Sequence, residues 1–150
     1  MIEIIKADNS NIEELMSIRL EMLKIVNNMS DEDKFDKILV ESSREYFLNG
    51  NQTTLLAKDG EKIIACASIS YILLMPTFSH PTGKRAHLMN VYTNKAYRHQ
   101  GIAKKMVSQL IAEAKEKGCT EISLDARPDG KPLYKVLGFT ENKEGMVLEL

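Results

Sequence analysis

The chain has 150 residues, of which 43% are hydrophobic and 27% are charged, as is typical of one globular domain with a sizeable core. Twenty basic and twenty-one acidic residues leave a formal net charge of −1, so the sequence lacks the basic excess that favours a nucleic-acid partner. The longest apolar run is too short to cross a bilayer, and we expect no membrane partner.

The start of the chain and its two cysteines indicate a cytoplasmic protein. Residues 1–7 alternate in polarity and lack the apolar core of a signal peptide. Cys66 and Cys119 match no metal-ligand spacing, so they are interpreted as reduced thiols in structured segments. No metal is therefore expected.

The first third of the chain predicts a short strand followed by two helices. Residues 2–5 are mostly isoleucine and indicate the strand. Apolar residues at helical spacing predict a first helix over 12–26. The acidic run 30–33 predicts the first turn of a second helix, which ends at Asn49-Gly50.

The middle third predicts three strands. Segments 53–58 and 61–71 flank Asp59-Gly60, a two-residue turn typical of a β-hairpin. The second segment is almost continuously apolar in its centre, so we expect it to be buried on both faces. A loop with two prolines begins at residue 73 and leads into the next strand, at 84–93.

The last third completes the order of elements. A helix with lysines in its last turn is predicted up to residue 117, then a strand over 121–125 and a short helix over about 130–137. A closing hairpin is predicted over 139–150, around Glu144-Gly145. The order β-α-α-β-β-β-α-β-α-β-β predicts one α+β (mixed α/β) domain with helices on both faces of a mixed sheet.

Residues 97–104 form the most informative motif, because they join the strand over 84–93 to an amphipathic helix. A strand, a glycine-containing turn and a helix start bring unpaired backbone N–H groups to the positive end of a helix dipole, where phosphate binds well. Arg98 adds a permanent charge, and Gly101 lets a ligand approach the backbone. These residues alone leave open an ordinary loop-to-helix junction with a surface arginine.

Two motifs together resemble one family. The spacing Arg-x-x-Gly-x-Ala in residues 98–103 resembles the acetyl-CoA pyrophosphate signature of the GNAT superfamily of N-acetyltransferases. Downstream, residues 132–139 resemble the family's "(L/F)YxxxGF" ending. The resemblance covers essentially the whole chain and implies one GNAT-like domain at 1–150 with a partly splayed central sheet. Arg127 stands where many members have Asn, so the cofactor contact of that Asn is in doubt here.

The resemblance implies acetyl-CoA as cosubstrate, and it implies which residues hold it. The backbones of Val91, Tyr92 and Thr93 would face the pantetheine arm, and the N–H of Val91 would stabilise the oxyanion. Tyr134 would contact the cofactor and protonate its departing sulfur as general acid; the alternative is a core tyrosine. The pyrophosphate would contact the turn and the helix start, which comprise Arg98, His99, Gln100, Gly101, Ile102, Ala103 and Lys104.

The general base is less defined than the acid. His87 lies on the strand before the splay, and its imidazole suits proton transfer near neutral pH. If the strand stays regular, His87 shares a face with Met89 and Val91. A half-exposed strand histidine without a role is the alternative. Asn90 could orient a substrate or a water, whereas His80 could line the acceptor site or be solvated.

The resemblance places the acceptor site on the first two helices and on the loop over 73–84. The helices carry Arg19, Glu21, Arg44 and Tyr46 as polar candidates. Arg19 and Glu21 lie off the apolar stripe of their helix, so both are interpreted as solvated. The implied acceptor is a primary amine of a small molecule or peptide, and a homodimer is possible.

The sequence thus predicts an acyltransferase that moves the acetyl group of acetyl-CoA to an amine by direct attack. The alternative on the same fold is a non-catalytic CoA-binding sensor or regulatory module, and Tyr134 favours the enzyme because a binder needs no acid beside the sulfur. A small NTPase is disfavoured, since Gly83-Lys84 lacks the earlier glycine and the following Ser or Thr of a Walker motif.

Overall fold

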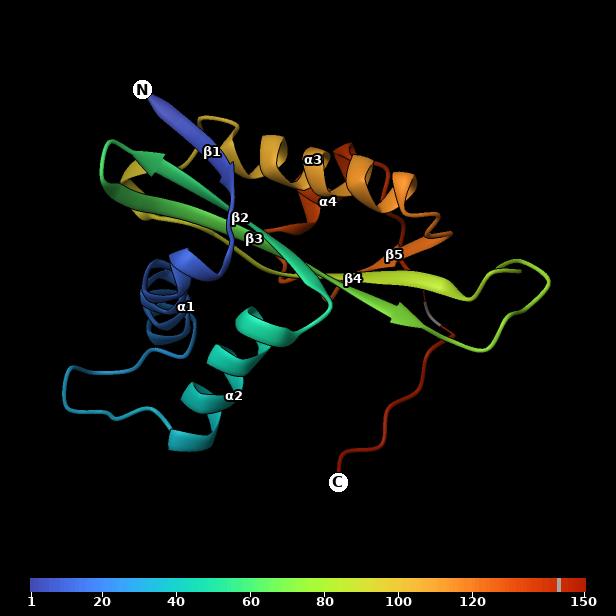
Figure 1. Ribbon diagram of the computed structural model, residues 1–150, viewed down its shortest axis with the longest axis horizontal. Helices are drawn as coiled ribbons and strands as arrows, with labels where there is room; N and C mark the ends of the chain where they lie inside the picture. The colour runs from blue at the N-terminus through green and yellow to red at the C-terminus, as the bar shows by residue number, and fades with distance from the viewer. Residues whose placement is uncertain (143) are drawn as a thin grey trace.

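The fold is built on a five-stranded mixed sheet in the order β1-β2-β3-β4-β5 (Figure 1). The structure is a computed structural model that describes residues 1–142 and 144–150. The first three strand pairs are antiparallel and the β4–β5 pair is parallel, which confirms the predicted mixed sheet. The strands are β1 (Ile2–Lys6), β2 (Gln52–Asp59), β3 (Lys62–Leu73), β4 (Lys84–Thr93) and β5 (Glu121–Ser123).

Helices cover both faces of this sheet, as the sequence predicts. In Figure 1, α1 and α2 lie on one side of the strands, whereas α3 and α4 lie on the other. Two short 3-10 turns precede α1 and α3. The bounds are η1 (Asn9–Asn11), α1 (Ile12–Val26), α2 (Lys37–Asn49), η2 (Lys95–Tyr97), α3 (Ile102–Glu116) and α4 (Lys131–Val136).

Each helical layer forms its own hydrophobic core against the sheet. On the α3 side, Met106, Val107 and Leu110 are at most 1% exposed and pack on β3 and β4. On the other side, Leu15 of α1 and Phe47 of α2 pack on the opposite face of β2 and β3. The central segment of β3 is buried on both faces, as the sequence predicts.

Leu110→Ala is expected to lower the free energy of unfolding by about 2–5 kcal/mol, because it leaves a cavity in the α3-side core. Urea denaturation measures this change. The matched control is Leu73→Ala at the end of β3, where the side chain is 76% exposed and its loss should cost little. Equal losses for the two variants would contradict this description of the core.

The second helix begins later than the acidic run predicts. Helix α2 starts at Lys37, where the side chain of Asp36 accepts a hydrogen bond from the Ile38 N–H at 2.7 Å. The acidic run instead forms a turn, in which Asp33 Oδ2 accepts from the Ser30 N–H at 2.7 Å. Short acidic side chains often satisfy the backbone locally in this way and so compete with helix formation.

The predicted closing hairpin over 139–150 is wrong for the residues that can be assessed. Residues 139–142 and 144–150 form no strand, while residue 143 of the predicted hairpin lies outside the described residues. The physical reason is the length of β5: three residues give the sheet only a short edge for a further strand. Figure 1 shows the C-terminal segment leading away from the sheet.

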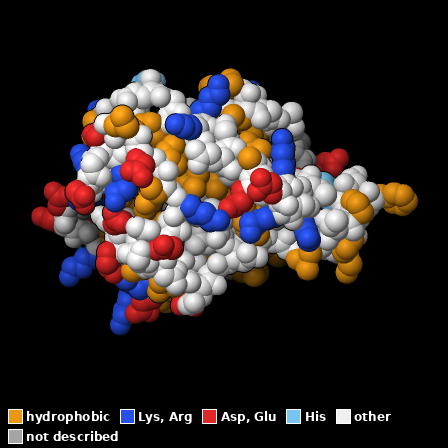
Figure 2. Space-filling view, turned by 45° about the horizontal axis from the view of Figure 1, so that its top comes forward, with side chains coloured by type: hydrophobic (Ala, Val, Ile, Leu, Met, Phe, Trp, Pro, Cys, Tyr) orange, Lys and Arg blue, Asp and Glu red, His pale blue; other side chains and the backbone are white. Residues whose placement is uncertain are grey.

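The β3–β4 connection projects beyond the helices at one end of the sheet. Apolar side chains gather at this tip, at the right of Figure 2. Leu73, Met75 and Phe78 are 76%, 82% and 106% exposed there. In the part of the chain that the structure describes, no helix is long and apolar enough to span a bilayer.

Candidate active site

Strand β5, at the edge of the sheet, pairs with only the first half of β4. Their parallel pairing covers Arg85, Ala86 and His87 of β4 and ends at the pair His87–Ser123. Strand β4 continues to Thr93, so its second half has no β5 partner in the register. The end of this pairing leaves backbone groups of β4 available to an extended ligand, while the splay that the resemblance implies stays a prediction.

A β-bulge lies in the second half of β4, which pairs with β3 but has no β5 partner. Ser68 pairs with Met89 and Cys66 with Tyr92, so Asn90 and Val91 together face only Ala67. Asn90 has a positive φ of 59°. Bulges re-aim the strand and leave one residue out of the ladder, and they are common beside active sites.

The bulge corrects one expectation about the faces of β4. Ala86 and Leu88 belong to the α3-side core, and Val91 packs against that core too. His87 and Met89 alternate with Ala86 and Leu88, so they face the α1/α2 side. His87 therefore does not share a face with Val91, because the strand does not stay regular.

Asn90 is held by three neighbours. Its Oδ1 accepts from Arg19 Nη1 at 3.1 Å, and its Nδ2 donates to Ser68 Oγ at 3.1 Å. Its backbone carbonyl accepts from Cys66 Sγ at 3.2 Å. Burial raises the pKa of Cys66 to about 12, so the thiol stays protonated as a donor. The bulge is thus fixed before any ligand binds.

The turn before α3 presents a group of free backbone donors. Gly101, with φ 77°, is the N-cap of α3 and offers no side-chain cap. The first helical hydrogen bond runs from the Lys105 N–H to the Gly101 carbonyl at 3.0 Å. The preceding N–H groups of Ile102, Ala103 and Lys104 have no acceptor within the described chain. Such a helix start is suited to an anion.

The side chains of this turn leave space above its backbone. A Cβ added at Gly101 would meet no atom within 4 Å, so the space there is open. Arg98 is exposed, and its Nε donates to the Thr93 carbonyl at 3.0 Å. This bond ties the turn to the end of β4, which is a positioning role that the sequence did not indicate. His99 and Gln100 are exposed beside Gly101.

Tyr134 lies on α4, half-buried on the α3 side of the sheet. Its ring packs edge-on against Phe139, with the centroids 5.8 Å apart. Its hydroxyl makes no hydrogen bond to the residues that the structure describes. Burial, with a smaller effect of Asp129, raises the pKa of Tyr134, so the phenol remains protonated at neutral pH. The hydroxyl is therefore a proton donor without a structural partner.

Gly130 is a supporting residue that lies two positions before the 132–139 motif and that sequence reasoning did not single out. A Cβ added there would lie 3.2 Å from Cε2 of Tyr134, tighter than ordinary contact. Glycine at this position therefore lets the tyrosine ring lie against the start of α4.

His87 lies where the β4–β5 pairing ends. Its Nδ1 is 2.8 Å from Ser123 Oγ, and its Nε2 is 3.9 Å from Asp125 Oδ2. The imidazole is partly exposed, on the face opposite to Tyr134. The two candidate proton-transfer groups thus lie on different faces of the sheet.

His87→Ala is expected to reduce acetyl transfer most at low pH, where the amine is protonated and needs a base. At high pH the amine loses its proton without help, so the loss of the imidazole should matter least there. A pH–rate profile measures this effect. The control is His80→Ala, since the His80 ring contacts Thr120 Oγ1 at 2.8 Å, away from the opening. A profile that His87→Ala leaves unchanged would make His87 purely structural.

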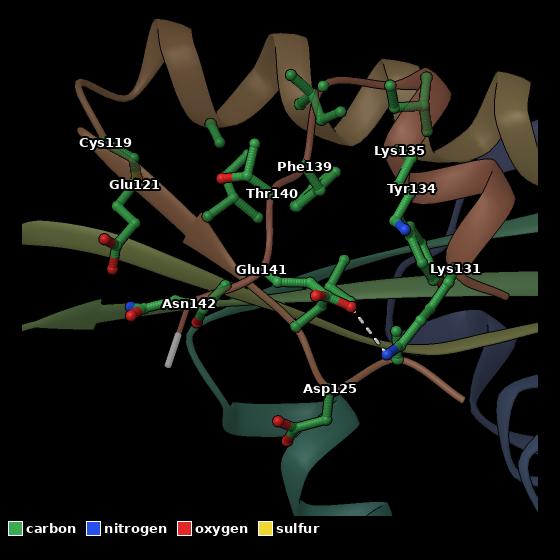
Figure 3. A pocket seen from close by; sticks show the side chains of 18 of the residues that line it. Cys119, Glu121, Asp125, Lys131, Tyr134, Lys135, Phe139, Thr140, Glu141 and Asn142 are labelled. Carbon is green, nitrogen blue, oxygen red and sulfur yellow. Dashed lines mark hydrogen bonds and ion pairs between the residues drawn. The ribbon is translucent and has the colours of Figure 1, made fainter. Parts of the chain in front are cut away.

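A hollow of about 1290 Å³ lies beside Tyr134, between the end of α3, β5, α4 and the segment after α4 (Figure 3). At its rim, Lys131 Nζ contacts Glu141 Oε1 at 3.0 Å. Its lining includes Tyr134 and Phe139 but no residue of the turn before α3. The sequence did not predict this hollow, whose lining includes Thr140 and Glu141 of the C-terminal segment.

The polar candidates for the acceptor side differ in their partners and in their exposure to solvent. The interpretation of Arg19 as solvated is wrong, because its side chain is half-buried against the sheet. Arg44 is partly exposed and pairs with Glu13 of α1 at 2.7 Å. Glu21 accepts a hydrogen bond from Asn94 at 3.4 Å, and Tyr46 Oη bonds to Ser70 Oγ at 2.7 Å. Within the described residues, no group of acidic, histidine and cysteine side chains could hold a metal ion.

The sequence matches one known protein family over most of its length. A sequence model of the Acetyltransferase (GNAT) family matches residues 13–139. The chain belongs to the GNAT acetyltransferase family. The match begins in α1 and ends at Phe139, so it includes the whole opening between β4 and β5 as well as α4.

A solved GNAT structure is similar over nearly the full chain. The crystal structure of a predicted acetyltransferase with acetyl-CoA from Clostridium acetobutylicum is 34% identical and has a TM-score of 0.86. The superposition covers 99% of this chain and 96% of that chain. The GNAT fold is therefore confirmed.

Curated GNAT relatives match over shorter segments. Glucosamine 6-phosphate N-acetyltransferase of Trypanosoma brucei brucei is 28% identical over 59% of this chain. Aminoglycoside N(6′)-acetyltransferase type 1 of Serratia marcescens is 30% identical over 67% of it. This chain spans 58% of the length of the first relative and 70% of the second.

Proposed function

We propose that this protein transfers the acetyl group of acetyl-CoA to a primary amine, as one catalytic domain at 1–150. The observation that carries the proposal is that a bulged half of β4, without a β5 partner, leads into an uncapped α3 start. A nucleotide cofactor with an extended arm needs both features: strand-like partners for the arm and free N–H groups for the pyrophosphate.

The proposed cofactor site follows the chain from β4 into α3. The pantetheine arm lies along the backbone of Val91, Tyr92 and Thr93. The side chain of Tyr92 is buried in the α1-side core, so its backbone makes the contact. The pyrophosphate lies on the backbone of residues 98–104, where Gly101 leaves open space. The acetyl group then lies at the bulge.

The proposed reaction is a direct attack of the amine on the thioester. The amine nitrogen forms a bond to the carbonyl carbon, and the oxyanion accepts a hydrogen bond from the N–H of Val91. The C–S bond then breaks, and the sulfur takes the phenolic proton of Tyr134. His87 is the proposed acceptor of the amine proton, since it lies on the opposite face from Tyr134.

Two measurements test this function. In a thermal-shift panel of acetyl-CoA, ATP and NAD, acetyl-CoA at about 100 times its Kd should add about 2.7 kcal/mol of stability, or roughly 5–10 °C. Release of CoA thiol is then followed with a library of amines. Stabilisation by ATP or NAD but not by acetyl-CoA would overturn the proposal. Binding of acetyl-CoA without thiol release would instead favour the sensor.

A further inference from the structure

Arg19 is a half-buried cation without an acidic partner among the described residues. It lies on α1, half-buried, and its Nη1 donates to Asn90 Oδ1 at 3.1 Å. Arg44 and Arg85 each pair with a glutamate, whereas no carboxylate of the described chain lies within ion-pair distance of Arg19. A charge removed from water normally has a partner, because its desolvation is costly.

The groups that surround Arg19 do not neutralise it. Cys66 and Tyr46 lie close enough to interact electrostatically with Arg19. Burial raises the pKa of each, so both are neutral at neutral pH. Glu21, on the same helix, is hydrogen-bonded to Asn94 at the far end of β4. Burial lowers the pKa of Arg19, yet a guanidinium stays charged in proteins.

The location of this cation relates it to the proposed reaction. Its partner Asn90 is the residue before Val91, whose N–H is the proposed oxyanion donor. Arg19 and His87 belong to the α1/α2 side of the sheet, whereas Tyr134 belongs to the α3 side. A ligand that enters from the α1/α2 side would therefore meet Arg19 next to the acetyl group.

We infer that Arg19 binds an anionic group, a carboxylate or a phosphate, on the amine acceptor. The inference rests on the proposed acetyl transfer and specifies its substrate class as an amine that also carries an anion. A guanidinium has five N–H donors, and the bond to Asn90 uses one of them, which leaves donors free for a bidentate contact.

This inference separates the substrate classes named for the relatives. Glucosamine 6-phosphate carries an amine and a phosphate, which suits a free guanidinium. Aminoglycosides carry several cationic amines, which a half-buried cation without an acidic partner repels. The acceptor of this protein should therefore be chemically closer to the first class.

Matched amine pairs test the inference. The pairs are glucosamine 6-phosphate with glucosamine, and lysine with lysinamide, so each pair differs in one anionic group. In at least one pair, kcat/KM should favour the anionic member by about 10- to 100-fold, as expected for a hydrogen-bonded charge pair. The pair that shows the preference distinguishes phosphate from carboxylate. Arg19→Gln should bring that ratio close to one, and Arg19→Lys should retain part of it.

Lys24→Gln is the matched control, because it removes a cation from the same helix that contacts Asp31 instead of the sheet. It should leave the anionic preference intact. Equal use of both members of each pair by the wild type, or an unchanged ratio in Arg19→Gln, would overturn the inference while acetyl transfer stands. If Arg19→Gln does not fold, the wild-type ratio and Arg19→Lys decide.

A binding measurement keeps the inference separate from the proposed function. If no amine is acetylated, glucosamine 6-phosphate and lysine are titrated calorimetrically into the CoA-saturated protein. Wild-type binding that is at least 10-fold weaker in Arg19→Gln would support the anion site although the proposed catalysis had failed. Equal binding by the two proteins would reject the anion site.

Discussion

Replacing Gly101 with alanine is expected to raise the KM for acetyl-CoA by about 10- to 100-fold, the equivalent of one or more lost hydrogen bonds to a charged group. The added methyl group would occupy the open space above the helix start, where the pyrophosphate is proposed to lie. Alanine at φ 77° also strains the turn, by roughly 1–2 kcal/mol. Steady-state kinetics with varied acetyl-CoA measure the change in KM.

Gly60→Ala separates the loss of binding from backbone strain. Gly60 has φ 62°, and an added Cβ there also meets no atom within 4 Å, but it lies in the β2–β3 turn. Both variants should lose similar stability, and only Gly101→Ala should lose affinity for acetyl-CoA. If the two variants bind acetyl-CoA equally well, the pyrophosphate does not lie on the α3 start.

The parts of the fold that follow local rules could be predicted from sequence. The helical spacing of α1 and α3 and the Asp59-Gly60 turn are short-range signals, and the structure confirms these elements. The turn at residues 98–103 was also recognisable, because its arginine and glycine have the spacing of the Arg-x-x-Gly-x-Ala motif. Its free N–H groups follow from the geometry of any uncapped helix start.

Features that depend on contacts between distant segments were missed. The bulge at Asn90 depends on partners in α1 and β3, which no local pattern around Asn90 reveals. Arg19 lies off the apolar stripe of its helix and so resembles a solvated residue, yet that side of α1 meets the bulge. The prediction of a C-terminal hairpin was wrong for a similar reason, since a further strand requires an edge with which to pair and β5 offers only three residues.

Tyr134→Phe is expected to lower kcat by about 100-fold, the low end for general acid assistance, because a thiolate is already a reasonable leaving group. The ring and its edge-on packing on Phe139 remain, so KM for acetyl-CoA should change little. An effect on kcat alone indicates an interaction made mainly in the transition state.

Because burial raises the pKa of Tyr134, the wild-type acid should remain active to a higher pH than an exposed tyrosine would allow.

Tyr71→Phe is the matched control for this substitution. The Tyr71 hydroxyl donates to the Glu113 carboxylate of α3, and Tyr134 has no such partner among residues 1–142 and 144–150. Tyr71→Phe should therefore lower stability by about 1–3 kcal/mol and leave kcat intact, whereas Tyr134→Phe should do the reverse. Urea denaturation and initial rates on both variants measure the two effects. A Tyr134→Phe protein that loses stability but keeps its kcat would show that the hydroxyl is structural, and the departing sulfur would then take its proton from water or from another group.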